Sequence, residues 1–330
     1  MLSLACVDRV PRPEASFMLV VHDYRFARRE RPTALVIGNF DGVHRGHREI
    51  LRSAVAQART HELDAVLITF EPHPTRVLAP DRASPLLTPI DRKLELLAAA
   101  GIECCVVQTF DRAFSMLGPR EFARYVLLGL RAADVFIGAN FRFGKDRAGD
   151  GPLLESLGQE LGFRAHVVPA VLQGDEVISS SRVRRALADG DLPLVEAMLG
   201  RRFDFDGLVV QGDRRGRQIG FPTANLDTGV EALPRDGVYA VRVFNRRNGP
   251  ADVLAMDGVM NIGVRPTFRA GRSVEVHILD RDEELYGATL RVECIARVRD
   301  EMRFDGVEAL RAQIQADVVR ARTVLAEVAP

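Results

Sequence analysis

The hydrophobic pattern of this chain changes near residue 190, and that change constrains the fold more than any other feature of the sequence. Before it, apolar runs alternate with segments of helical spacing; the runs are TALVIGNF (33–40), AVLITF (65–70), IECCVVQTF (102–110) and ADVFIGANF (133–141). Strands that are apolar throughout are buried on both faces, and helices between them connect parallel strands. The first part is therefore predicted to be an α/β domain with a parallel sheet, which binds ligands beyond the carboxyl ends of its strands.

After residue 203 the apolar residues alternate singly with polar ones. The alternating runs are FDGLVVQGD (205–213), GVYAVRVFN (237–245), VLAMDGVMNIG (253–263), SVEVHILD (273–280) and ATLRVECIARVRD (288–300). Turn residues separate these runs, which predicts an antiparallel sheet or a small barrel. The amphipathic stretch 307–328 predicts a helix after the last strand.

The chain has 330 residues, more than one compact core usually serves, so two domains are expected. We expect residues 1–17 to be an extension without regular structure and residues 18–190 to form the first domain. Residues 191–202, with a short helical pattern, are expected to be a linker, and residues 203–330 to form the second domain.

Composition excludes several classes of protein. Lys+Arg and Asp+Glu both number 45, which argues against a general nucleic-acid binder. No apolar run approaches the length of a membrane span, and the charged amino terminus lacks the core of a signal peptide. The 4 cysteines include no CxxC pair, so neither a disulfide framework nor a zinc site is expected. These features fit a cytoplasmic protein without membrane or nucleic-acid partners.

The stretch GNFDGVHRGH (38–47) stands where the first long apolar run meets the first helix. A helix start favours anions, and histidines three residues apart share one face of a helical turn. His44 and His47 could therefore donate hydrogen bonds to the same phosphate group. The alternatives are a pair of surface histidines, or a metal site for which no third ligand lies nearby.

Two further stretches hold polar groups at chain turns. In ISSSRVRRAL (178–187), serines at a helix start either cap the helix or bind a triphosphate, and Ser181 and Arg184 share a face. In GLVVQGDRRGRQIGFPTANL (207–226) there is no Walker sequence. Thr223 and Asn225 would share one face of an extended segment and could both bind one Mg²⁺. A plain hairpin loop is the alternative there.

The first half resembles the amino-terminal module of bifunctional bacterial riboflavin kinase/FAD synthetases, which are nucleotidyltransferases with an H-x-G-H signature. The resemblance covers GNFDGVHRGH, TFEPHP (69–74), IGANFRFGKDRAGD (137–150) and ISSSRVRRAL. It implies a Rossmann-like domain with catalytic His44 and His47 and flavin contacts from His73 and Asn140, although His73 could equally serve loop structure. The ATP contacts that it implies are Gly38, Phe40, Asp41, His44, His47, Ser180, Ser181 and Arg184. The family usually has Thr where this chain has Ser181, and often Asp where it has Asn140.

The second half resembles the riboflavin kinase module of the same family. The motifs are the glycine-rich turn with PTAN, then GVYAV, NIGVRPTF (261–268) and VEVHILD. The resemblance implies an antiparallel barrel with Glu275 as catalytic base, whose alternative is an outward polar residue on a half-exposed strand. It implies ATP contacts from Gly212, Gly220, Thr223 and Asn225, with Mg²⁺ on the last two. Arg299 and Glu301 are weaker candidates for flavin contacts, with a charged loop as the alternative.

The resemblance implies two successive transfers. Riboflavin would receive the γ-phosphoryl group of ATP to give FMN, and FMN would then receive AMP from a second ATP to give FAD and pyrophosphate. The expected partners are riboflavin, FMN, ATP and Mg²⁺, and the chain is expected to be a monomer or a weak homo-oligomer. A single-activity adenylyltransferase would not need the second domain, and a non-catalytic flavin-binding protein would tolerate loss of Glu275 and the histidines.

Overall fold

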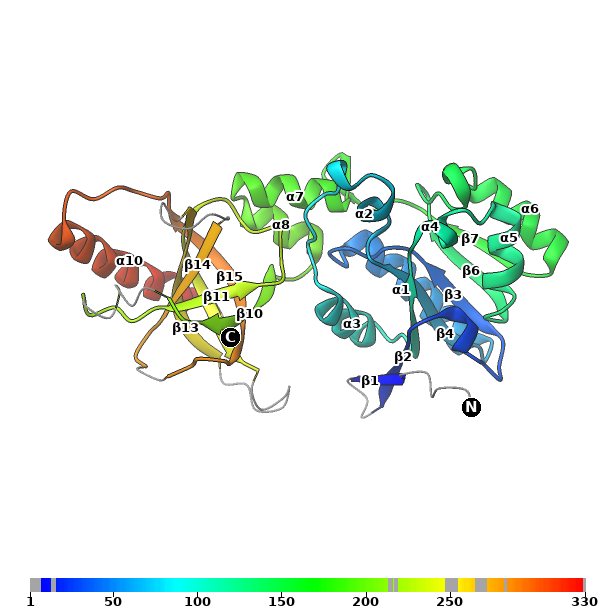
Figure 1. Ribbon diagram of the computed structural model, residues 1–330, viewed down its shortest axis with the longest axis horizontal. Helices are drawn as coiled ribbons and strands as arrows, with labels where there is room; N and C mark the ends of the chain where they lie inside the picture. Colours follow the sequence, from blue (N-terminus) through cyan, green and yellow to red (C-terminus); the bar gives the residue numbers. More distant parts are fainter. Residues whose placement is uncertain are drawn as a thin grey trace. The chain divides into compact units, whose positions relative to one another are not determined.

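The chain forms two compact units in the computed structural model, one built on a sheet with helices and the other on a barrel (Figure 1). The structure describes residues 7–12, 16–212, 216, 219–246, 255–264, 272–281 and 284–328. The first unit holds residues 1–84 and 88–180, and the second holds residues 85–87 and 181–330.

The sheet of the first unit has the strand order β1-β2-β5-β4-β3-β6-β7 within the described residues. The strands are β1 (Val7–Pro11), β2 (Phe17–Val21), β3 (Thr33–Ile37), β4 (Asp64–Glu71), β5 (Cys104–Thr109), β6 (Ala132–Gly138) and β7 (Arg164–Val168). All neighbours from β2 to β7 pair in parallel, and only β1 runs antiparallel to its neighbour. The predicted parallel sheet is therefore confirmed, and the carboxyl ends of its strands share one edge.

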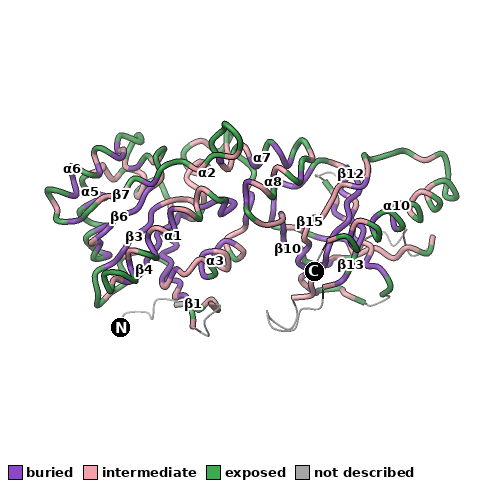
Figure 2. The backbone as a smooth tube through the Cα atoms, turned by 180° about the vertical axis from the view of Figure 1, so that it is seen from behind, coloured by how far each residue is buried: buried purple, intermediate pink, exposed green. Residues whose placement is uncertain are grey.

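Helices cover both faces of this sheet. They are α1 (Arg45–Thr60), α2 (Pro74–Leu78), α3 (Ile90–Ala99), α4 (Arg112–Ser115), α5 (Pro119–Phe122), the π-helical turn η3 (Ala123–Leu127) and α6 (Gly151–Leu161). Val36 of β3 packs in one core with Leu51 of α1 and Leu97 of α3. The next residue back, Leu35, packs in a second core with Val126 of η3. This alternation explains why the strand is apolar throughout, and Figure 2 shows its backbone as buried.

Short elements complete the first unit. They are the 3₁₀ turns η1 (Tyr24–Phe26), η2 (Pro80–Arg82) and η4 (Lys145–Arg147), and the hairpin of β8 (Leu172–Gln173) and β9 (Glu176–Val177).

The expectation that residues 1–17 lack regular structure does not hold for residues 7–11. They form β1, which pairs with β2 at the edge of the sheet, while residues 1–6 and 13–15 lie outside the described residues. Asp8 and Arg9 are exposed there, and Pro11 ends the strand. Charges and proline are tolerated on an edge strand because one side of it needs no hydrogen-bond partner. These charged residues and the proline are also the reason why the sequence predicts no regular structure for this segment.

The second unit is a closed antiparallel barrel with the strand order β10-β11-β14-β13-β12-β15. The strands are β10 (Asp204–Val210), β11 (Ala224–Thr228), β12 (Gly237–Asn245), β13 (Ala255–Val264), β14 (Arg272–Ile278) and β15 (Thr289–Arg299). Val276, Met260 and Tyr239 lie opposite one another on β14, β13 and β12 and are fully buried in the interior. Glu275 and His277 alternate with Val276 and therefore face outwards.

Helix α10 (Val307–Glu327) covers part of the outer face of the barrel, as the sequence predicts (Figure 1). Val318, Ala321 and Leu325 of α10 share a core with Val238 and Val259 of the barrel strands. These outward strand positions are apolar because the helix removes them from water.

The boundary between the units differs from the expected one. The second unit begins at Ser181, so that α7 (Ser180–Asp189) and α8 (Leu192–Leu199) belong with the barrel. The amide of Arg235 donates to the Leu187 carbonyl of α7 at 2.9 Å. Asp191 caps the start of α8, and the expected linker 191–202 is mostly this helix.

Candidate active sites

The loop after β3 has a strained backbone. Phe40 has a φ of 52° and Val43 a φ of 39°, positive angles that non-glycine residues rarely adopt, and Gly42 between them has a φ of 88°. A Cβ at Gly38 would lie 3.0 Å from the ring of Phe40, so glycine lets that buried ring fold back onto the strand end. The loop is thereby held in one tight conformation that turns β3 into α1.

The histidine pair of this loop is assembled as the spacing predicts. His44 is the N-cap of α1, and its Nδ1 accepts a hydrogen bond of 3.2 Å from the His47 amide. The two rings are stacked with centroids 3.6 Å apart, and the ring of Phe40 lies 5.0 Å from that of His47. Since Nδ1 of His44 is an acceptor, neutral His44 carries its proton on Nε2 and can donate it to a ligand.

The surroundings of the pair disfavour the protonated form of His47. Burial lowers the pKa of His47 well below its ordinary value, and the proximity of His44 and of Lys93 lowers it further. Nδ1 of His47 is buried and has no hydrogen-bond partner within the described structure. His47 is therefore neutral at pH 7, and it contributes a hydrogen bond rather than a full positive charge.

Asp41 connects the loop to two other segments. Its carboxylate Oδ1 accepts a hydrogen bond of 3.1 Å from the Thr88 amide, and its backbone carbonyl accepts one of 2.8 Å from Ser180 Oγ. Asp41 is buried, so its carboxylate organises the site from inside. Ser180 is thus brought to the loop, Ser181 is exposed at the start of α7, and Arg184 Nε donates to the Pro85 carbonyl at 2.6 Å.

His73 and Asn140, the predicted flavin contacts of the first unit, follow the carboxyl ends of β4 and β6. His73 caps α2, with its Nδ1 2.8 Å from Thr75 Oγ1 and accepting from the Thr75 amide at 3.3 Å. Asn140 is exposed in a turn. His73 therefore has a structural role in its loop, whereas the Asn140 amide is open to a ligand.

In the barrel, the strand register assembles the second set of predicted residues. Asn225 of β11 and Asn261 of β13 lie on either side of Glu275 of β14. Thr223 Oγ1 lies 3.5 Å from Glu275 Oε2. A hydroxyl, a carboxylate and two amides thus form one polar row on the outside of the barrel.

Two glycines shape the turn before β11. A side chain at Gly212 would overlap the amide group of Asn225, and Gly220 has a φ of 88°. The amide of Phe221 donates to the Gly216 carbonyl at 2.9 Å, which closes the turn. Residues 213–215 and 217–218 of the same motif lie outside the described residues. Gly212 is therefore needed for a close approach of the turn to Asn225.

Arg299 and Glu301, the remaining flavin candidates, leave the end of β15. Arg299 donates to the buried carboxylate of Asp317 through Nε at 2.9 Å and Nη2 at 2.7 Å, which ties α10 to the barrel. The Glu301 carboxylate lies over Gly263, where a side chain would overlap it. Arg299 is thus engaged within the protein, while Glu301 is exposed beside β13.

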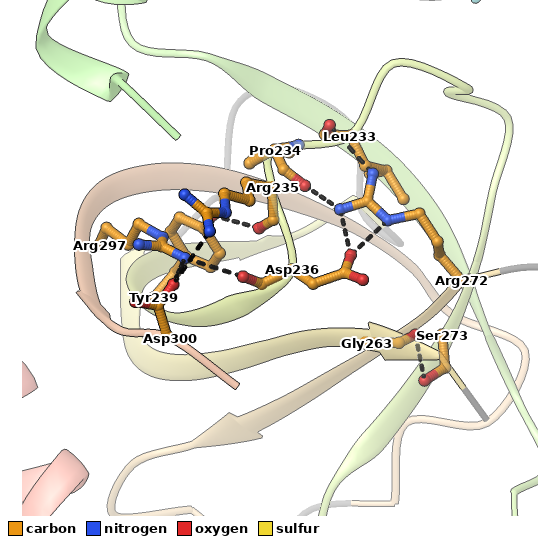
Figure 3. A network of polar contacts seen from close by, with 10 residues as sticks. All are labelled: Leu233, Pro234, Arg235, Asp236, Tyr239, Gly263, Arg272, Ser273, Arg297 and Asp300. Carbon is orange, nitrogen blue, oxygen red and sulfur yellow. Dashed lines mark hydrogen bonds and ion pairs between the residues drawn. The ribbon is translucent and has the colours of Figure 1, made fainter. Parts of the chain in front are cut away.

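A network of arginines supports the same end of β15 (Figure 3). Arg297 Nη2 donates to the Asp236 carbonyl at 2.9 Å and also contacts Asp300, and the Tyr239 hydroxyl donates to the Arg235 carbonyl. Arg272 Nε donates to Asp236 Oδ1 at 2.7 Å. These bonds fix the loop before β12 against the segment that carries Glu301.

Sequence reasoning missed two residues near these sites. Asn261 begins the NIGVRPTF motif, but its position opposite Glu275 follows from the strand register and not from its spacing in the chain. Lys93 lies on α3, a helix that has no motif of its own, and its position beside Asp41 and Glu71 depends on the packing of α3. For Lys93, the one signal in the sequence is that lysine is scarce in this chain.

Both halves of the chain match known protein families. Residues 26–182 match the FAD synthetase family, and residues 199–325 match the riboflavin kinase family. Over 290 residues the chain is 41% identical to a bifunctional riboflavin kinase/FMN adenylyltransferase of Escherichia coli (strain K12), and the match covers 87% of this chain and 91% of that relative. The chain belongs to the family of bifunctional riboflavin kinases/FMN adenylyltransferases.

Two further matches also cover most of the chain. A bifunctional riboflavin kinase/FMN adenylyltransferase of Bacillus subtilis (strain 168) is 34% identical over 307 residues, which are 90% of this chain and 94% of the relative. A crystal structure described as a macrolide-efflux protein from Streptococcus pneumoniae is 29% identical, with a TM-score of 0.82 over 92% of this chain and 98% of that one. Within the described part of this chain, no helix is both long and apolar enough to span a membrane. The predicted family and the two fold classes are confirmed.

Proposed function

We propose that the chain makes FAD from riboflavin in two transfers, each at the site described for one unit. The barrel transfers the γ-phosphoryl group of ATP to the ribityl hydroxyl of riboflavin, which gives FMN and ADP. The sheet unit joins the FMN phosphate to the α-phosphorus of a second ATP, and pyrophosphate leaves. The observation that carries this proposal is the grouping of Thr223, Asn225 and Glu275 in one unit and of the stacked histidines in the other.

In the kinase reaction, Glu275 is the base. Its carboxylate accepts a hydrogen bond from the riboflavin hydroxyl and takes the proton as the oxygen bonds to the γ-phosphorus. Because the transition state is loose, the carboxylate mainly orients the hydroxyl. Gly212 and Gly220 let the turn approach the phosphates of ATP, and the row of Thr223, Asn225 and Glu275 fixes the hydroxyl beside them.

The oxygen atoms of Thr223 and Asn225 fit Mg²⁺. This ion prefers oxygen ligands and usually takes few from the protein, with substrate phosphates and water completing its shell. The described residues contain no cluster of three or more His, Cys, Asp and Glu side chains that could hold a metal by themselves, which suits an ion that arrives with ATP. When bound, Mg²⁺ would neutralise charge on the transferred phosphoryl group.

In the adenylyl transfer the FMN phosphate is already a nucleophile, so no strong base is needed. An FMN phosphate oxygen attacks the α-phosphorus of ATP, the bond to the β-phosphate oxygen breaks, and no proton needs to move. His44 and His47 donate hydrogen bonds to the oxygens that gain charge, and the strained loop keeps both donors in place. Ser180, whose hydroxyl donates to the loop, and Gly38, Phe40 and Asp41, which shape the loop, complete the ATP site of this unit. Ser181 and Arg184 remain proposed ATP contacts on the strength of the family resemblance.

The flavin contacts remain part of the proposal. Asn140 and Glu301 are exposed beside the two sites, so their polar groups are accessible to a flavin. His73 and Arg299 are engaged in hydrogen bonds within the protein, so their contribution would come from the ring face of His73 and the stem of Arg299. We also propose a cytoplasmic protein that is a monomer or a weak homo-oligomer, which sedimentation equilibrium tests.

The direct test is incubation of the purified full chain with riboflavin and MgATP, followed by chromatography over time. FMN should rise first and FAD should follow, and EDTA in excess of Mg²⁺ should stop both. FAD that forms only when FMN is supplied would contradict the kinase assignment. Absence of both products in folded protein would contradict the whole proposal.

A further inference from the structure

Lys93 is a buried cation that forms no direct ion pair with the described residues. It lies in the first turns of α3 and is 3% exposed, yet lysine is rarely buried unless it is paired. Its ammonium makes no hydrogen bond or ion pair within the described structure. The chain has 45 basic residues, of which only Lys93 and Lys145 are lysines and the rest are arginines. A lysine at this position therefore stands out against the strong preference of the chain for arginine.

Lys93 lies near charged and polar residues of the adenylyl-transfer site. Lys93 interacts electrostatically with Asp41 of the loop after β3 and with Glu71 at the carboxyl end of β4, and it influences His47. The start of the helix is held against the loop because the Thr88 amide donates to Asp41. Burial lowers the pKa of Lys93, while Asp41 and Glu71 oppose that shift and favour the charged form.

The reaction at this site needs a positive charge near the phosphate groups. Two stacked imidazoles 3.6 Å apart cannot both be positive without strong repulsion, and the environment of His47 keeps it neutral. The reaction brings together an FMN phosphate and a triphosphate, so that several negative charges meet. A hydrogen bond from neutral His47 orients a phosphate oxygen, but it does not neutralise that oxygen.

We propose that Lys93 binds a phosphate oxygen at the adenylyl-transfer site and supplies a positive charge that neutral His47 lacks. Its ammonium stays protonated throughout, while the bond from FMN to the α-phosphorus forms and the bond to pyrophosphate breaks. This inference rests on the proposed function of the sheet unit. The oxygen could belong to FMN or to ATP, and the alternative role for Lys93 is a structural counter-charge for Asp41 and Glu71.

The first experiment compares Lys93→Met, Lys93→Arg and the control Lys145→Met in the full chain. Lys145 is the second lysine, exposed in η4 of the same unit. Lys93→Met should lower the rate of FAD formation from FMN about a hundredfold, as loss of a transition-state contact does. Riboflavin phosphorylation by the same preparation and the urea unfolding midpoint should stay unchanged. A larger KM for FMN or for MgATP identifies which phosphate is bound, and Lys93→Arg should retain more activity than Lys93→Met.

The second experiment does not depend on a variant of Lys93. Protein labelled with ¹³C at the lysine ε-carbon should give two NMR signals, and the exposed control Lys145→Met leaves only the signal of Lys93. Pyrophosphate, FMN and MgATP are added separately, and the pKa of Lys93 should rise with whichever provides the oxygen, because an anion favours the charged form. The signal of Lys145 should not move.

Some results would overturn the inference. These are a Lys93 signal that none of the three ligands shifts, normal FAD formation by Lys93→Met, or loss of both activities with a lower unfolding midpoint. A chain that makes no FAD at all would instead refute the proposed function, and the pyrophosphate titration would still report on the phosphate site.

Discussion

His47 shows at the scale of one residue how a site can be organised by its protonation state. Its ring is stacked on His44, and one of its nitrogens is buried without a partner. The neutral form suits this position because it avoids repulsion from His44, and in the proposed function it donates a hydrogen bond to a phosphate oxygen. The same arrangement makes the folded unit sensitive to acid.

We expect the stability of the chain to fall as the pH falls below the ordinary histidine pKa of 6.5. The folded state holds the pKa of His47 below that value, so the unfolded chain binds the proton first and gains from it. Stability is therefore lost progressively from pH 6.5 downwards, until the pH reaches the pKa of the folded state. Urea unfolding of wild type and His47→Gln at several pH values checks this. The variant should show the weaker dependence on pH, and an equal or steeper dependence would contradict the account.

Asp317→Asn should destabilise the barrel strongly. Asp317 is 3% exposed and receives bonds from Arg299, so the change leaves a mostly buried guanidinium without its counter-charge. Removing one partner of such a pair costs about 3 kcal/mol. Urea unfolding measures the loss. Asp280→Asn is the matched control, since Asp280 also pairs with α10, through Arg322, but at the surface. That variant should change little, and similar losses in both would show that burial is not the cause.

At the scale of elements, strands with a clear apolar pattern were predicted well. A strand with few apolar residues and a strand at the edge of a sheet were not. The run 237–245 coincides with β12, and the apolar runs 65–70 and 102–110 lie within or around β4 and β5. β11 was not recognised as a strand because ANLDT has few apolar residues, and its stability comes from pairing with β10 and β14. β1 was missed because its charges are those of an edge strand.

The candidate sites also contain residues whose grouping follows from local spacing and residues whose grouping depends on packing between distant segments. The histidine pair depends on local helix geometry, so its spacing was enough to predict that the two side chains share one face. The stacking of the two rings was not predicted. The grouping of Glu275 with Thr223 and Asn225 came from the family resemblance, because strands far apart in the chain must pair in one register to form it. Lys93 depends on how α3 packs against the loop, and no local pattern reports such packing.

Gly212→Ala should act on the whole turn before β11. The new methyl group would overlap the Asn225 amide, so the turn or the asparagine must move. A misplacement of about 1 Å costs on the order of a hundredfold in rate, and FMN formation should fall by that amount. FAD formation from FMN should not change. Gly306→Ala is the control, because nothing lies within 4 Å of its added methyl group. Equal effects of both changes on the kinase rate would contradict this account of Gly212.

At the scale of the whole molecule, the two units hold different chemical solutions to phosphate transfer. In the proposed mechanism the barrel uses a carboxylate on a strand, because a neutral hydroxyl must lose a proton. In the same proposal the sheet unit uses imidazoles at a helix start, because its nucleophile is already an anion. The product of the first transfer is the substrate of the second, so one chain can convert riboflavin to FAD. We expect a substitution at one site to inactivate one step and leave the other step active.

The most direct test of two separate sites is the rate of each half-reaction in two full-length variants. Glu275→Ala should abolish FMN formation from riboflavin and leave the conversion of FMN to FAD within about twofold of wild type. His47→Ala should reduce FAD formation on the order of a hundredfold and leave the phosphorylation of riboflavin intact. If either substitution removed both activities in protein that circular dichroism shows to be folded, the assignment of the two reactions to the two sites would be wrong.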